Sequence, residues 1–451
     1  MNSEDPKARP RPPRIVPRAE HTVSRADVSS NALKVLYRLK NAGYSAFLVG
    51  GGVRDLLLGR HPKDFDVVTD AHPEQVNQLF RNCRLIGRRF RLAHVRFGRD
   101  IIEVATFRAT GTNGNGNGPG EGEDDRSHSD SGRILRDNVY GSIDEDIWRR
   151  DFTVNALYYN IADFTLWDYT NGLEDIKSRT LRLIGDPVTR YREDPVRMLR
   201  AVRLAAKLDF HIAPETEAPI RELAELLKDV PPARLFDEVL KLFHAGAALK
   251  SFEMLREYHL FHYLFPATSA VLNEPDGAAA LEFVREGLKN TDERVREDKP
   301  VTPMFLFAVF LWPPIKKLAE ELRGEGLSPV MALNEASHRI VAEQQLHITF
   351  PKRFAIPMKE ILAMQSRFEN RRGPRAAKLL EHKRFRAAYD FLLLRARCGE
   401  ADAEIADWWT KAQELPPEQQ REALGGGKKK RRRRSKSRRG RAGAGGAFDA
   451  A

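Results

Sequence analysis

The stretch LVGGGVRDLLLGRHPKDFDVVTD, Leu48–Asp70, decides how this chain is interpreted. Asp64 and Asp66 stand one residue apart at the start of Phe65–Thr69, a short segment typical of a β-strand. Side chains alternate between the two faces of a strand, so the two carboxylates should point the same way. Neighbouring carboxylates repel each other, and a divalent cation removes that penalty. Ligands that are all oxygen suit Mg²⁺ or Mn²⁺ rather than zinc, so the pair is a candidate metal site.

A glycine triplet precedes the two aspartates. Glycines allow a tight turn whose backbone N–H groups approach phosphates closely, which makes Gly51 and Gly52 candidate nucleotide-binding positions. Arg54 follows the turn and is a candidate multidentate phosphate donor. The spacing fits neither a P-loop nor a dinucleotide-binding fingerprint, because Asp55 stands where the last glycine of the fingerprint would be.

A third carboxylate would complete a two-metal site, in which the ions lie roughly 3.5–4 Å apart. Glu103 in IIEVATF, on a predicted neighbouring strand, and Asp151 in RRDFTVNALYY are the candidates, and the sequence leaves the choice open. Each residue alone has a plainer interpretation. An isolated Asp-x-Asp is usually a solvated strand end, and an isolated Asp151 would cap a helix. Their occurrence together with the glycine turn favours catalysis.

The amino-acid composition argues against several classes of protein. The two cysteines, Cys83 and Cys398, lie far apart, which argues against a disulfide framework and a structural zinc site. The longest apolar run, Met304–Trp312, is too short to cross a bilayer, and the Arg- and Pro-rich start lacks a secretory pattern. We therefore expect a cytoplasmic protein with no membrane insertion.

The pattern along the chain predicts an α+β fold, in which a head with a mixed sheet precedes an all-helical neck and body and a disordered basic tail. The predicted divisions are 1–28, a disordered Pro- and Arg-rich extension; 29–185, the head, with a mobile insertion at 110–132; 186–250, the neck; 251–424, the body; and 425–451, the tail. Predicted helices cover 31–41, 54–58 and 73–80, and predicted strands cover 46–49, 65–69, 94–97, 101–107, 167–169 and 181–184.

The net charge of +12 is concentrated at the ends of the chain, chiefly in KKKRRRRSKSRR, Lys428–Arg439. This tail is too charged to fold alone, and it predicts nonspecific, salt-dependent attraction to RNA through residues such as Lys428, Arg431 and Arg434. A solubilising extension or a nuclear localisation run is the alternative.

Five ordered blocks make the chain resemble the class II tRNA nucleotidyltransferase and bacterial poly(A) polymerase family. They are LVGGGVRDLLLG, KDFDVVTD, IIEVATFRA, RRDFTVNALYYN and REDPVRMLRAVRLAAKL. The block LIGRRFRLAHVRFG and the Arg-rich tail are similar to the poly(A) polymerase branch. The Gly/Asn-rich insertion departs from the family, and the region beyond 213 matches it only loosely.

The resemblance implies a polymerase β-like nucleotidyltransferase head and a role for each matching residue. Asp64 and Asp66 would bind the catalytic metals, and Asp151 would be an active-site carboxylate. Arg150 and Asn155 would help to hold the nucleotide, and Asp194 and Arg197 would form a base-reading pair.

The Asp194/Arg197 pair also has an independent chemical interpretation. The residues stand three apart at the start of a predicted helix and so share a face. Asp accepts hydrogen bonds and Arg donates them, which complements the Watson–Crick edges of adenine and cytosine. Guanine and uracil would leave polar groups unpaired, at about 1–3 kcal/mol each. The pair does not separate an ATP-only enzyme from one that also uses CTP.

Further basic residues are candidates for nucleotide or RNA contact. Arg200 continues the stripe of Arg197 along the predicted helix, with a solvated basic face or salt bridges to acids elsewhere as the alternatives. Arg88, Arg89 and Arg91 surround an aromatic residue, a combination that can bind a backbone and stack a base, with a strand that buries Phe90 and exposes the arginines as the alternative. His94 in the same block is interpreted as structural, because two-metal chemistry does not require a histidine base.

These features predict attack of an RNA 3′-OH on the α-phosphate of ATP, with release of pyrophosphate. The expected partners are RNA 3′ ends, ATP and, by family analogy, RNA-decay factors. Two alternatives stand beside this prediction: a CCA-adding enzyme specific for tRNA, and a noncatalytic RNA-binding protein on the same fold.

Overall fold

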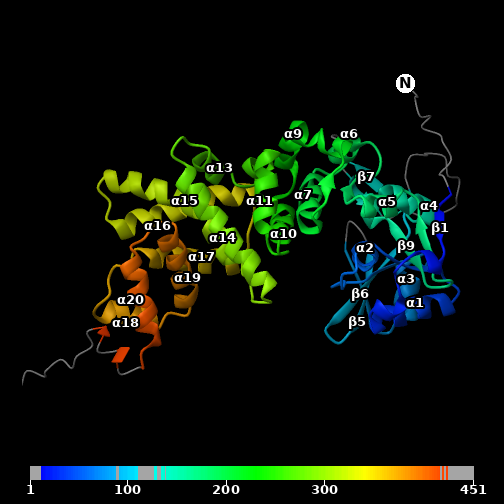
Figure 1. Cartoon of the computed structure of the whole chain (residues 1–451), viewed down its shortest axis with the longest axis horizontal. Coiled ribbons are helices and arrows are strands. Elements are labelled where there is room, and N and C mark those ends of the chain that lie inside the picture. Colours follow the sequence, from blue (N-terminus) through cyan, green and yellow to red (C-terminus); the bar gives the residue numbers. More distant parts are fainter. Residues whose placement is uncertain are drawn as a thin grey trace, which may run out of the picture. The chain divides into compact units, whose positions relative to one another are not determined.

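The computed structural model describes residues 12–87, 91–109, 126–128, 134–137, 139–416, 419–420 and 423–424 (Figure 1). The chain divides into two compact units, Met1–Leu362 and Ala363–Ala451. The first unit contains a mixed sheet followed by many helices, and the second is helical in its described part. The predicted α+β organisation is confirmed.

The main sheet has eight strands in the order β1-β10-β9-β2-β3-β6-β5-β4. Strands β3 and β6 are parallel, whereas the other neighbouring pairs are antiparallel. The strands are β1 (Arg14–Val16), β2 (Ala46–Val49), β3 (Asp66–Thr69), β4 (Cys83–Ile86), β5 (Leu92–Phe97), β6 (Asp100–Thr106), β9 (Leu157–Asn160) and β10 (Leu166–Asp168). The side chains of Phe47, Val49 and Val68 join Ile147 and Tyr158 in one buried cluster.

The prediction of a disordered extension over 1–28 is wrong for residues 14–28. Strand β1 pairs with β10 at the edge of the sheet, with Ile15 opposite Trp167. Val16 and Val23 are only 2% and 1% exposed, so this Arg- and Pro-rich segment still buries apolar side chains. Composition missed the strand because scattered apolar residues carry no periodic signal. Residues 1–11 lie outside the described part of the chain.

Two other predictions fall largely or wholly outside the described residues. Of the predicted insertion at 110–132, only 126–128 are described, as β7 (Arg126–His128), which pairs with β8 (Ile134–Asp137). The basic tail over 425–451, with its predicted RNA contacts, is not among the described residues.

The three helices predicted for the sheet region are present as α1 (Ser30–Asn41), α2 (Gly51–Leu57) and α3 (Pro73–Leu79). Two further short helices, α4 (Ile143–Asp146) and α5 (Gly172–Lys177), were not predicted. Helix α2 begins three residues earlier than predicted, because Gly50 supplies the positive φ at its N-cap and the next two glycines already have helical geometry.

The rest of the first unit is a helical array. Its helices are α6 (Pro187–Glu193), α7 (Val196–Leu208), α8 (Pro214–Glu217), α9 (Ile220–Leu223), α10 (Pro232–Phe243), α11 (Ala248–Glu257), α12 (Leu260–Leu264), α13 (Pro266–Leu272), α14 (Ala278–Arg296), α15 (Pro303–Gly324) and α16 (Pro329–His347); α17 (Lys352–Gln365) crosses into the second unit. Phe310 packs against Phe243, Phe261 and Phe265, with ring centroids 4.8, 5.6 and 4.6 Å apart. The array buries a Phe-rich core.

One short strand interrupts the predicted all-helical neck. Strand β12 (His211–Ile212) pairs in parallel with β11 (Thr180–Leu181). The predicted strand over 181–184 is therefore shorter and lies in a separate two-stranded sheet, and Leu183 makes an isolated bridge with Phe152. A two-residue strand has no detectable sequence period, which explains the miss.

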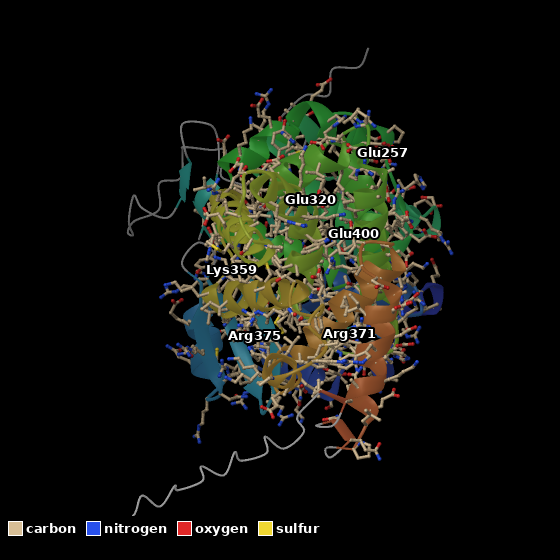
Figure 2. The ribbon with its side chains drawn as sticks, turned by 90° about the vertical axis from the view of Figure 1, so that its left-hand side faces the viewer. Glu257, Glu320, Lys359, Arg371, Arg375 and Glu400 are labelled. Atoms are coloured by element: carbon tan, nitrogen blue, oxygen red, sulfur yellow. The ribbon has the colours of Figure 1, made fainter. Side chains whose placement is uncertain are left out.

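The second unit contains three helices after α17 in its described part, and Trp409 of the last helix packs against Phe368 and Phe385. The three helices are α18 (Pro374–Leu380), α19 (Phe385–Arg397) and α20 (Ala403–Glu414). Nε1 of Trp409 donates to the carbonyl of Phe368 at 2.8 Å. Arg371 and Arg375, labelled in Figure 2, are exposed on this unit. Among the described residues, no helix is long and apolar enough to span a membrane.

Candidate active site

Asp66 and Glu103 lie side by side on the two parallel strands. Asp66 in β3 is in register with Glu103 in β6, and Glu103 is in register with His94 in β5. Directly paired residues project from the same face of a sheet, so these three side chains share one face. Nε2 of His94 lies 3.2 Å from Oε1 of Glu103.

The Asp66 carboxyl sits in a negative environment. Burial, followed by the charges of Glu103 and Asp64, raises its pKa to about 6, although Arg150 acts in the opposite direction. Asp64 precedes the strand and is exposed, whereas Asp66 is partly buried. The predicted pair of neighbouring acids is present, with Glu103 as a third charge close to Asp66.

The glycine turn packs directly on this acidic pair. Gly50 has φ +76°, and a Cβ at this position would lie 3.4 Å from Oδ2 of Asp66. A Cβ on Gly52 would lie 3.3 Å from the Asp64 carbonyl, and one on Gly51 would lie 3.3 Å from Nη2 of Arg54. The absence of side chains lets the start of α2 approach both aspartates.

The Arg54 guanidinium is hydrogen-bonded to neighbouring side chains. Arg54 is 4% exposed, and it donates to Oδ1 of Asp55 at 2.6 Å and to Oδ1 of Asn155 at 2.6 Å. Two predicted nucleotide-binding residues, Arg54 and Asn155, are therefore brought together from distant segments. In this arrangement Arg54 braces the Asn155 amide, and a phosphate would have to compete with both partners.

Arg150 forms a second bracing cluster. Its Nη2 and Nε donate to Oδ2 of Asp146 at 2.9 Å and to the Tyr158 hydroxyl at 2.7 Å, and that hydroxyl donates to the same Asp146 oxygen at 2.8 Å. Sequence reasoning missed Asp146 and Tyr158. Tyr158 follows Arg150 in the same block, but nothing in its spacing indicates that its hydroxyl turns back to this arginine.

Asp151 is held by Arg200 of α7. Nε of Arg200 donates to Oδ2 of Asp151 at 2.7 Å, and Nη2 donates to the same oxygen. Burial would raise the pKa of Asp151, but the Arg200 charge and hydrogen bonds, with the Phe152 amide, lower it to about 2. Of the two candidate third carboxylates, Glu103 is the one whose charge acts on Asp66, and Asp151 is paired with a guanidinium.

Arg190, which the sequence did not single out, connects α6 to the same loop. Its Nη2 donates to the carbonyls of Arg149 and Arg150 at 3.0 and 2.6 Å, and its Nη1 donates to Glu193 at 2.8 Å. Arg190 is 9% exposed. The backbone next to Asp151 is thus fixed from the helical region, and the only available signal was the position of Arg190 four residues before Asp194.

The predicted base-reading residues lie where α6 meets α7. Nη1 of Arg197 donates to the Arg190 carbonyl at 2.7 Å and to Glu193 at 3.0 Å. Asp194 accepts a hydrogen bond from Arg234 of α10 at 2.7 Å. Asp194 caps the end of α6 and Arg197 lies in the first turn of α7, so the shared helical face that was expected is replaced by a helix junction.

The remaining predicted contacts are surface residues or are not described. Arg91 pairs with Glu74 at 2.7 Å, and both side chains are 51% exposed. Arg88 and Arg89 fall outside the described residues, as do Lys428, Arg431 and Arg434.

The acidic cluster is chemically suited to a divalent cation, because burial and then the charges of Glu103 and Asp64 disfavour ionised Asp66, as its raised pKa shows, and a cation would offset both effects. Among the described residues, no group of three or more His, Cys, Asp and Glu side chains is gathered closely enough to hold a metal ion. Mg²⁺ commonly uses one or two protein carboxylates and takes its remaining oxygens from water and substrate phosphates, which fits this geometry.

Three segments match known family models. Residues 46–182 match the poly A polymerase head domain, residues 209–272 match the "Probable RNA and SrmB- binding site of polymerase A", and residues 325–442 match the polymerase A arginine-rich C-terminus. The CCA-adding enzyme of Thermotoga maritima, solved in complex with tRNA, has the same fold, with a TM-score of 0.56 at 19% identity over 89% of this chain and 86% of that chain. The fold and the site together define a nucleotidyltransferase.

Curated relatives narrow this class. Poly(A) polymerase I of Salmonella typhimurium is 52% identical over 409 residues, which is 90% of this chain and 87% of that protein. The CCA-adding enzyme of Lactobacillus helveticus is 36% identical over 234 residues, 52% of this chain and 55% of that protein. The chain belongs to the bacterial poly(A) polymerase family, as its sequence motifs predicted.

Proposed function

We propose that this protein extends RNA 3′ ends with AMP taken from ATP, releasing pyrophosphate without a template. The observation that carries the proposal is the Asp66–Glu103 pair on adjacent strands beside a glycine turn, in a chain 52% identical to a poly(A) polymerase I over most of its length. The backbone N–H groups of the turn at the start of α2 are the groups that would bind the triphosphate, and Asp66 and Glu103 face the same side of the sheet.

Asp64 and Asp66, with Glu103, are the groups that would hold Mg²⁺ or Mn²⁺. Bound there, divalent ions would neutralise charge on the triphosphate and stabilise the attacking and leaving oxygens. Asp151 is assigned a different task. Its carboxylate is paired with Arg200, so it positions the loop between Arg150 and Asn155 and is not the third ligand.

Base choice is assigned to the junction of α6 and α7. Both hydrogen bonds of the Arg197 side chain use Nη1, so among the described residues Nε and Nη2 remain for an acceptor such as N1 of adenine. Asp194 is oriented by Arg234 and would accept from the adenine N6 amine. The bracing contacts keep the pair rigid, which strengthens discrimination against guanine and uracil.

The rival function is tRNA-specific CCA addition, since the fold is shared with CCA-adding enzymes. The lower identity and half-length match of the Lactobacillus relative favour polyadenylation. Partnership with RNA-decay factors in the cytoplasm extends the same proposal.

The test is extension of a generic RNA by the purified full chain with Mg²⁺ and each nucleoside triphosphate separately. We expect long tails from ATP, little addition from CTP, and none from GTP or UTP. Asp66→Asn is the inactive control and should still bind RNA. Addition confined to tRNA and requiring CTP would establish the rival, and RNA binding without any nucleotide addition would leave only a noncatalytic role.

A further inference from the structure

A polar cavity of about 370 Å³ opens where α11, α12 and α13 meet, remote in sequence from the carboxylate site. It is lined by Arg256, His259, Phe261, His262, Ser269 and Asn273. Glu257, the residue after Arg256, marks this corner in Figure 2. The volume is in the range of ligand pockets, which is about 300–1,000 Å³.

The lining is rich in donors and contains no acid. Arg256 is always charged, the two histidines, Ser269 and Asn273 each offer a donor, and Phe261 is 1% exposed, which leaves little ring surface for stacking. Acids close in sequence to the lining pair with other cations: Glu257 lies 3.9 Å from Arg221, Glu253 lies 2.6 Å from Arg285, and Glu274 pairs with Lys317.

The Arg256 guanidinium packs against an aromatic ring and not against a carboxylate of the described residues. The guanidinium carbon lies 5.7 Å from the centre of the Phe252 ring, and within the described residues no carboxylate pairs with it. A preorganised guanidinium beside imidazole, hydroxyl and amide donors is suited to a phosphate group.

Short contacts connect this corner to the active-site loop. The Tyr258 hydroxyl donates to Glu217 at 2.9 Å, and the Tyr191 hydroxyl of α6 donates to the carbonyl of the adjacent Thr216 at 2.9 Å. Helix α6 also carries Arg190, which donates to the Arg150 carbonyl. The cavity is therefore built into the same framework that fixes the site, on the segment that matches the RNA-binding family model and just beyond it.

We propose that this cavity binds a backbone phosphate of the RNA being extended, upstream of its 3′ end. The inference rests on the proposed RNA-extending function and adds a named anchoring site to it. The lining sets several hydrogen-bond donors around one permanently charged guanidinium, which suits a phosphate, so the contact should be independent of sequence. Such an anchor would hold long RNA between successive additions.

The test compares the full-length Arg256→Gln and His262→Asn variants, singly and together, with wild type. Binding of a fluorescent 30-nucleotide RNA is measured by anisotropy without ATP, across a salt series. We expect the double variant to bind about tenfold more weakly, and Arg256→Gln to lower the slope of log affinity against log salt by about one. Arg339→Gln, which removes an exposed arginine of α16, is the charge-matched control and should match wild type.

Kinetics supply the second readout. The KM for the 30-nucleotide RNA should rise about tenfold in the double variant, with the KM for ATP unchanged and less effect on a trinucleotide primer. Unchanged RNA affinity and salt slope, or equal loss on both RNA lengths, would overturn the anchor. The proposal would also be overturned if the variants lost binding of inorganic phosphate or ATP but kept the wild-type affinity for RNA. Because RNA binding is measured without ATP, loss of the anchoring site can be distinguished from an absence of polyadenylation activity.

Discussion

Arg200 of α7 donates two hydrogen bonds to one oxygen of Asp151, so a helix outside the main sheet holds an acid of the active-site loop. Arg190 of the preceding helix fixes the two carbonyls before the same acid. The α6–α7 junction, which carries the proposed base-reading pair, is therefore bonded directly to the loop after Arg150. Under the proposed function, these hydrogen bonds would couple nucleotide choice to the position of the loop.

Arg200→Gln should lower kcat at least tenfold, because Asp151 would lose its charge partner while remaining buried. Breaking a buried ion pair costs about 3 kcal/mol, so the Tm should also fall. Arg203→Gln is the matched control, since it removes another α7 arginine from a buried carboxylate, Glu238. Both variants should lose stability, as measured by thermal unfolding, and only the first should lose kcat. Equal kcat values for the two variants would mean that Asp151 is merely structural.

Asp66→Asn should stabilise the metal-free protein at neutral pH. The folded pKa of about 6 lies above the unfolded value, so the folded state holds the proton more tightly. The penalty for ionising Asp66 is absent below about pH 4, grows as the pH rises to 6, and is constant above that. We expect the variant to be about 1–3 kcal/mol more stable at pH 8 in EDTA, with no difference near pH 4. Mg²⁺ should raise the Tm of wild type more than that of the variant.

Gly50→Ala should impair nucleotide addition more than it impairs folding. The methyl group would stand 3.4 Å from Oδ2 of Asp66, at a φ of +76°. Gly59 has φ +68°, and a Cβ added there would have nothing within 4 Å, so Gly59→Ala also places a side chain at positive φ, at about 1–3 kcal/mol, without the contact. Gly50 has ψ −144°, which favours glycine strongly, so the Tm of Gly50→Ala should fall further, and a fall in kcat/KM for ATP at temperatures where both variants are folded is expected. Equal activities would show that the close approach is unimportant.

His94→Ala should weaken the response to metal. Without the 3.2 Å contact from His94, the half-exposed Glu103 carboxylate is free to turn away from Asp66. The Mg²⁺ concentration for half-maximal extension should rise about three- to tenfold, with a smaller change in the KM for ATP. His94→Gln keeps a side-chain nitrogen at a similar reach to Glu103 and should restore most of the response. An Mg²⁺ titration that is the same for all three proteins would contradict a positioning role.

Much of the site could be predicted from the sequence because the residues that indicate it lie close together along the chain. The spacing of Asp64 and Asp66, the glycine triplet and the apolar run after them lie within one stretch, and strand alternation follows from backbone geometry alone. The resemblance added Asp151, Asp194 and Arg197, which the structure gathers around one junction.

Other features could not be read in this way. Arg234 reaches Asp194 across 40 residues and Arg200 reaches Asp151 across 49, and no periodic pattern encodes such pairs. The strand at Arg14–Val16 was missed because its stability comes from a partner strand far along the chain.

The amino-acid sequence by itself determined the chemistry of this protein: which acids adjoin the glycine turn, and where strand gives way to helix. Those properties depend on neighbouring residues, whose relative positions the covalent backbone dictates. Tertiary structure decided that Glu103 rather than Asp151 stands beside Asp66, and that Arg54, Arg150 and Arg200 have internal partners. Strand register and side-chain pairing are set by the packing of distant segments, whose free energy no local pattern contains.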